Sequence, residues 1–114
     1  MISHRDVSDN LRIISLTGRL DILGTEEIAA EFTALAATKK RCVIVELSGL
    51  TTLASIGIRA LISNGKSLQK IGGRMALVVG DNVIVTKTLE TTGISVLLKL
   101  FKTIPEAESS LLDG

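Results

Sequence analysis

The stretch RCVIVELSGLTTLASIGIRAL, residues 41–61, decides the fold. Its first part, residues 41–47, is an apolar run with a single acid. A continuous apolar run of this length is typical of a central strand that is covered on both faces. Residues 48–53 predict a loop, and from about Ser55 to about Lys70 the apolar residues recur at helical spacing. Strand, loop and helix in this order predict an α/β domain.

The same alternation of short apolar runs and helical patterns extends to both sides of this stretch. Further strands are predicted at residues 2–7, 11–16, 75–79 and 96–101. Further helices are predicted to start near Thr25, at Asp81 or Asn82, and at Thr103-Ile104-Pro105. We therefore predict a single α/β domain over residues 1–114, with a mixed sheet of four or five strands and helices packed mainly on one face.

The core of this domain must be aliphatic, because the chain has two Phe and no Trp or Tyr. The apolar faces of the predicted elements supply its members, which are expected to be Ile28, Phe32, Val43, Val45, Leu61, Leu77 and Val79. The second helix is also predicted to bury Ile58, Ile62, Leu68 and Ile71. The single cysteine, Cys42, lies in an apolar run and is expected to be a small buried side chain.

Composition argues against several classes of function. The formal net charge is +1 and no long cluster of Lys or Arg is present, which argues against binding nucleic acid or an anionic membrane surface. No apolar stretch approaches the roughly 20 residues that span a bilayer, and the N-terminus has no signal-peptide core, so a cytoplasmic protein is expected. With one His and one Cys, we expect no metal site, no cofactor and no enzymatic activity.

The start of the helix predicted at Ser55 is the candidate site. A helix start presents free N–H groups and about half a positive charge, which together stabilise a phosphate. The preceding loop and first turn carry Leu50, Leu53 and Ile56, more apolar side chains than a solvated loop needs. Two interpretations remain: these side chains form a surface for a partner, or Ser55 caps the helix while they fill the edge of the core.

Several segments resemble, in order, those of the STAS domain family, which includes anti-sigma factor antagonists and the cytoplasmic tails of sulfate transporters. They are LTGRLD at 16–21, VIVELSGL at 43–50, SIGIRAL at 55–61, the glycine pair at 72–73 and LETTGI at 89–94. The resemblance covers nearly the whole chain and implies the STAS fold.

One position departs from the family pattern. The antagonists of this family read Asp-Ser-Ser-Gly at the helix start, and the second serine is phosphorylated. Here residues 54–57 read Ala-Ser-Ile-Gly, so Ile56 stands at the position of the phosphoacceptor. Only Ser55 offers a hydroxyl, and one residue along a helix turns a side chain by about 100°. Ser55 is therefore the candidate phosphorylation site, although it need not face a kinase as the missing serine would.

The resemblance implies a non-enzymatic regulator that binds a serine-kinase-type anti-sigma factor and so regulates transcription in a bacterium. The start of the second helix and the turn at 18–21 would form the interface, with partner-binding residues Asp21, Leu53, Ser55, Ile56 and Gly57. The alternative is an adaptor subunit of a signalling scaffold or of a membrane transporter complex. The protein is expected to be a monomer or a weak dimer.

Overall fold

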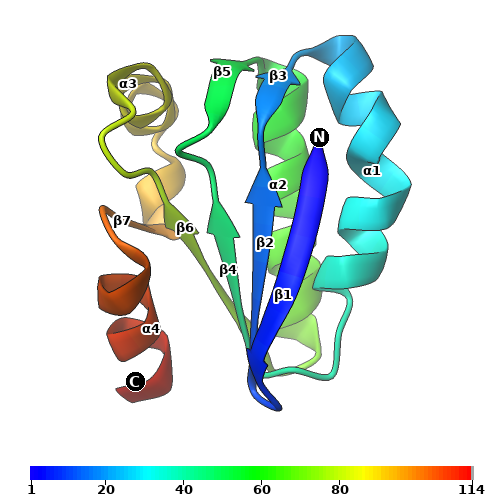
Figure 1. Cartoon of the computed structure of the whole chain (residues 1–114), viewed down its shortest axis with the longest axis vertical. Helices are drawn as coiled ribbons and strands as arrows, with labels where there is room; N and C mark the ends of the chain where they lie inside the picture. The colour runs from blue at the N-terminus through cyan, green and yellow to red at the C-terminus, as the bar shows by residue number, and fades with distance from the viewer. Residues whose placement is uncertain (114) are drawn as a thin grey trace.

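The computed structural model describes residues 1–113 and consists of a sheet flanked by helices (Figure 1). The strands are β1 (Ile2–Ser8), β2 (Leu11–Leu16), β3 (Gly18–Leu20), β4 (Cys42–Glu46), β5 (Leu50–Leu53), β6 (Arg74–Val78) and β7 (Lys99–Phe101). The helices are α1 (Ile22–Ala36), α2 (Ser55–Lys70), α3 (Val83–Thr92), the 3₁₀ helix η1 (Ile94–Val96) and α4 (Ile104–Asp113).

Five strands form one mixed sheet in the order β1-β2-β4-β6-β7. β1 and β2 pair antiparallel through a tight turn, whereas the other neighbours pair parallel and are joined by helical connections. Beyond the ends of β2 and β4 the chain continues into a second parallel pair, β3 and β5. The mixed five-stranded sheet confirms the predicted fold class.

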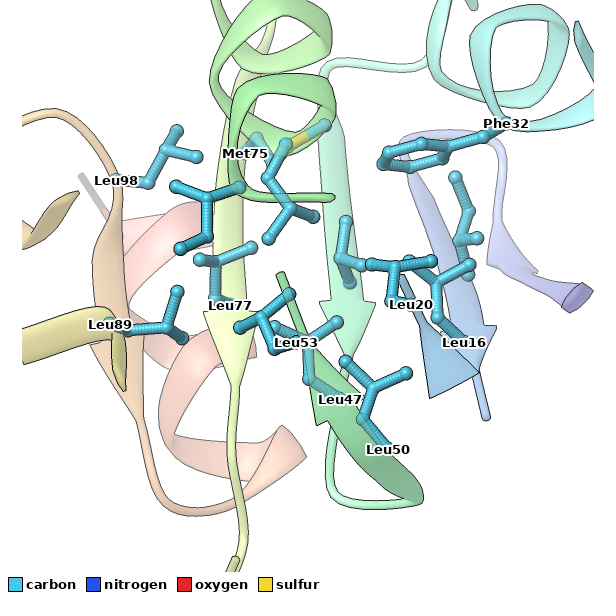
Figure 2. Close-up of a cluster of buried hydrophobic side chains, with 14 of the residues drawn as sticks. Leu16, Leu20, Phe32, Leu47, Leu50, Leu53, Met75, Leu77, Leu89 and Leu98 are labelled. Carbon is cyan, nitrogen blue, oxygen red and sulfur yellow. The ribbon is translucent and has the colours of Figure 1, made fainter. Parts of the chain in front are cut away.

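Both faces of the five-stranded sheet are covered. The larger apolar cluster lies between the sheet and α1, α2 and α3, and it contains the seven residues predicted to form the core. Two of them, Phe32 and Leu77, are labelled in Figure 2. A smaller cluster lies between the other face and α4, and it includes Cys42 and Ile44. The continuous apolar run of β4 follows from this arrangement, because its successive side chains point to opposite faces and both faces are buried.

The first helix starts earlier than predicted. α1 begins at Ile22 rather than near Thr25, because Asp21 is the capping residue and its Oδ1 accepts from the Gly24 N–H at 2.9 Å. Gly24 lies so close to the preceding strand that a Cβ there would collide with the Arg19 carbonyl oxygen. Thr25 lies on the buried side of the helix, where its hydroxyl caps nothing.

Three further predictions were wrong in detail. Residues 50–53 form a strand rather than a loop, because they pair with β3. Only 99–101 of the predicted strand 96–101 is a strand, since Gly93 adopts the left-handed conformation (φ 73°) and a 3₁₀ turn follows it. Ile71 is exposed rather than buried, because it lies beyond the last residue of α2, where the chain turns at Gly72 (φ 86°).

Val45 tests the central position of β4, because its side chain is 0% exposed. We expect Val45→Asp to unfold the domain, since an unpaired buried charge costs about 3–5 kcal/mol, comparable with the whole stability of many domains. The matched control is Val96→Asp at a side chain that is 87% exposed, which should melt within a few degrees of the wild type. A Val45→Asp variant with an unchanged thermal midpoint would contradict this position of β4.

Candidate functional site

The candidate site lies at the end of the molecule where β3 and β5 lead into α1 and α2 (Figure 1). Leu20 in β3 pairs with Leu53 in β5, and the Ala54 N–H donates to the Leu20 carbonyl oxygen at 3.0 Å. Each strand is separated from its helix by a single residue, Asp21 or Ala54. The two helices therefore start side by side at the same level.

The helix starts at this end differ in how they are capped. Asp21 caps α1, and Asn82 caps α3 by accepting from the Val85 N–H at 3.1 Å. The Asn82 side-chain amide also donates to the carbonyl oxygens of Ser48 and Leu50, at 3.0 and 2.7 Å. It thus ties α3 to the segment that leads into β5. α2 lies between them and has no side-chain cap, because its N-cap residue is an alanine.

Asp21 is held by two donors. Besides the Gly24 N–H, it accepts from Arg19 Nε at 3.0 Å. The hydrogen bond from the Gly24 backbone, followed by the one from Arg19, holds the pKa of the Asp21 carboxyl below its ordinary value. Asp21 therefore stays ionised at neutral pH and fixes the start of α1.

Gly57 sits where α2 passes close to β3. A Cβ on this residue would lie 2.9 Å from Leu20 Cδ2 and 3.1 Å from the Leu20 carbonyl oxygen. Any larger side chain would push the first turn of α2 away from β3. Gly57 therefore sets the position of the neighbouring side chains of Ser55 and Ile56 without being exposed itself.

The predicted site residues fall into two groups. Ser55 is exposed and Ile56 is partly buried, whereas Leu53 is only 9% exposed and belongs to the core (Figure 2). The expectation that Leu53 lies on the surface was wrong, because pairing with β3 turns its side chain into the sheet–helix layer. The interpretation of Ser55 as the helix cap was also wrong, since Ser55 is the first residue of the helix itself.

The exposed apolar side chains at this end come from residues that the sequence did not single out. Ile22 and Leu23, in the first turn of α1, are 62% and 72% exposed. Val83 and Ile84, in the first turn of α3, are each 64% exposed. Their exposure could have been predicted from the helical repeat, because it places them away from the buried side of each helix, which carries Ile28 on α1 and Val85 on α3.

The single His and the single Cys lie away from the helix starts, on β1 and β4. Across residues 1–113, no group of three or more His, Cys, Asp or Glu side chains lies close enough to hold a metal ion. His4 is exposed on β1, and Cys42 is buried, which raises the pKa of its thiol. None of the helices in this part of the chain is both long enough and apolar enough to cross a membrane.

Comparison with known proteins places this α/β domain in a family. The STAS domain family model matches residues 4–107, and the chain belongs to this family. None of the curated protein sequences matches the chain significantly.

Solved structures share the fold at low sequence identity. An anti-sigma-factor antagonist (STAS) domain protein from Planctomyces limnophilus is 22% identical, with a TM-score of 0.85 and 97% of each chain covered. The anti-sigma factor antagonist SpoIIAA, a Bacillus cell fate determinant, is 20% identical in its unphosphorylated form, with a TM-score of 0.77 and 100% and 98% of the two chains covered. The murine anion transporter Slc26a9 is 18% identical, with a TM-score of 0.79; 94% of this chain matches 18% of the transporter.

The charge on Asp21 should make stability depend on pH. Its lowered pKa means that the ionised form is stabilised by folding, so this contribution is present above about pH 3.9 and is lost as the pH falls through the lower folded-state pKa. Asp21→Asn keeps a capping oxygen but removes the charge. We expect the variant to melt below the wild type at pH 7, with the difference shrinking as the pH falls through the lowered pKa of Asp21.

Melting temperatures across this pH range measure the effect. Asp9→Asn is the matched control, because Asp9 is an exposed carboxylate that precedes no helix, and it should follow the wild-type curve. A gap between wild type and Asp21→Asn that stays constant down to acid pH would show that the charge does not act as described.

Proposed function

We propose that this chain is a non-enzymatic protein-binding regulator that acts as an antagonist of a serine-kinase-type anti-sigma factor. The family membership supports this class of function, as do structural neighbours described as anti-sigma factor antagonists. We further propose that one STAS domain occupies residues 1–114 and that it works in the cytoplasm of a bacterium, needing neither metal nor cofactor.

The observation that carries the proposal is the surface at the helix starts. Ser55 and Ile56, at the uncapped start of α2, lie at the same level as the exposed Ile22 and Leu23 of α1. Exposed apolar side chains that gather at one end of a small domain are typical of a protein-binding surface. We place the partner there, with Asp21 and Gly57 holding the surface in shape.

A specific observation favours a second function. Ile56 has no hydroxyl at the position where antagonists of this family carry their phosphoacceptor, so a phosphorylation switch at that position is lost. A protein without the switch suits a permanent adaptor subunit, in a signalling scaffold or on a membrane transporter, and the fold is shared with part of the transporter Slc26a9. Affinity capture from the native cell followed by mass spectrometry distinguishes a kinase-type partner from membrane or scaffold subunits.

Binding of the captured partner should depend on Ile56. Truncating a contact of this size to Ala commonly costs about 1–3 kcal/mol of affinity, so we expect Ile56→Ala to weaken the complex about 5- to 150-fold in calorimetry. Val96→Ala removes an apolar side chain that is 87% exposed on η1, and it should leave affinity unchanged. Equal affinities for wild type and Ile56→Ala, with both folded, would move the interface elsewhere.

The natural chain should not be switched by phosphate. After incubation with the captured kinase-type partner and Mg-ATP, we expect mass spectrometry to find Ser55 unmodified, because its hydroxyl is turned by about 100° from that of the missing acceptor. The Ile56→Ser variant should instead be phosphorylated at residue 56. A buried unpaired phosphate costs about 2–5 kcal/mol, so phosphorylation should lower affinity by roughly 30- to 4000-fold.

The double variant Ser55→Ala/Ile56→Ser is the control for this experiment, since it leaves a single hydroxyl at the helix start. It should take up phosphate as readily as Ile56→Ser. Stoichiometric phosphate on Ser55 of the natural chain would overturn the prediction.

A further inference from the structure

Two neighbouring helices carry charges of opposite sign. The charged residues of α1 are all acidic: Glu26, Glu27 and Glu31. Those of α2 are all basic: Arg59, Lys66 and Lys70. All of these side chains are exposed, and within residues 1–113 none of them takes part in a salt bridge. The two helices pack side by side, yet their charges do not pair with one another inside the molecule.

The charges lie on the outer sides of the helices, away from the sheet. Arg59, Lys66 and Lys70 are spaced by seven and four residues, which places them along one line of α2, opposite the side that buries Leu61 and Leu68. On α1, Glu27 and Glu31 are one turn apart on the exposed side. We name the exposed sides of these two helices, with the six charges given above, the α1/α2 face.

Short side chains separate the acids of α1. Ala29, Ala30 and Ala34 are exposed on this helix and present little bulk. The distance at which two helices pack is set by the side chains between them, so alanines allow a second helix to approach closely. No other segment within residues 1–113 covers the exposed alanines, and their contact with a partner would bury apolar surface between the charges.

The acidic and basic residues also match in height. Leu20 pairs with Leu53 and one residue separates each strand from its helix, so α1 and α2 begin at the same level. Counted from those starts, Glu27 is the sixth residue of α1 and Arg59 the fifth of α2, while Glu31 is the tenth and Lys66 the twelfth. At 1.5 Å per residue, the members of each pair differ in height by only about 1.5 and 3 Å.

These observations together define a surface that is complementary to itself. Consider a two-fold axis that runs parallel to both helices and lies between the α1/α2 faces of two copies. Rotation about this axis places α1 of one copy against α2 of the second copy at equal height. Glu27 then faces Arg59 of the second copy and Glu31 faces Lys66, and symmetry repeats both pairs. We propose that this chain self-associates through the α1/α2 face as an isologous, salt-dependent dimer.

The charge pattern favours a second copy of this chain, rather than a different protein, as the partner that binds the α1/α2 face. A partner that carries one sign of charge would be attracted to one helix and repelled by the other. The same chain presents both signs at the required spacing and height. Because the ion pairs are exposed, each contributes little and is screened by salt, so the dimer should be weak at physiological ionic strength.

This inference is independent of the proposed function. The two surfaces adjoin, because Arg59 follows Ser55 by four residues, or about 6 Å along α2, but none of the six charges is a residue proposed above to bind the partner. Self-association is measured without any partner protein, so its outcome says nothing about the anti-sigma factor, and the reverse also holds.

Charge exchange between the helices provides the sharpest test. One variant, Glu27→Lys/Glu31→Lys, makes both members of each proposed ion pair basic, and the other, Arg59→Glu/Lys66→Glu, makes both members of each pair acidic. Either variant alone should repel itself, so its dissociation constant in sedimentation velocity should rise by about tenfold or more. An equimolar mixture should dimerise again, because each helix then meets its opposite sign in the other variant.

The dimer of the wild-type chain should also weaken as NaCl is raised from about 10 mM to about 1 M, over which the Debye length falls from about 30 Å to about 3 Å.

The matched control for the charge variants is Arg5→Glu/Lys99→Glu, which changes the net charge as much as the acidic variant does. Arg5 pairs with Ile13 and Lys99 with Ala76, both on the sheet face that α4 covers, so this control should dimerise like the wild type.

Three results would overturn the proposal, provided that circular dichroism shows every variant folded. The first is a wild-type chain that stays monomeric at low salt over the whole concentration series. The second is an equimolar mixture of the two charge variants that does not associate. The third is a dimer that persists unchanged in either variant alone.

Discussion

The pairing of β3 with β5 is the constraint on which the rest of this molecule depends. Leu20 stands opposite Leu53, and the Ala54 N–H donates to the Leu20 carbonyl oxygen. This pairing buries Leu53, positions Gly57 against β3 and starts α1 and α2 at one level. Without it, the exposed apolar residues at the helix starts would not share one end, and the charges along the two helices would not match in height.

Much of this fold could be predicted from the sequence, because a segment with a buried face shows a regular pattern of apolar residues. β4 is apolar from Cys42 to Val45, since α4 covers one face of the sheet and the other helices cover the opposite face. α2 was predicted at its observed limits because its apolar residues keep one phase for four turns and a glycine follows. Wherever a segment is buried along a whole face, its own residues were enough to predict its structure.

The sequence fails where a residue's environment is set by a distant segment. Residues 50–53 contain two threonines and carry no alternation, so only the presence of β3 makes them a strand. Asn82 could be predicted as a candidate cap of α3, but the donation of its side-chain amide to two carbonyl oxygens near β5 has no trace in the local pattern. In the site, Ser55 and Ile56 could be located, but Ile22 and Leu23 were not, because α1 was predicted to start near Thr25 and these residues were not placed on it.

The two proposed surfaces share one helix, and this has a consequence for control. The start of α2 carries Ser55 and Ile56, and Arg59, the first charge of the α1/α2 face, follows Ser55 by about one turn, or 6 Å. A second copy bound on the α1/α2 face would thus reach the edge of the partner surface and compete with a large partner for it. Competition of this kind is governed by protein concentration and ionic strength. It requires no hydroxyl at position 56, so a chain with Ile56 would still have a means of regulating its exposed helix start.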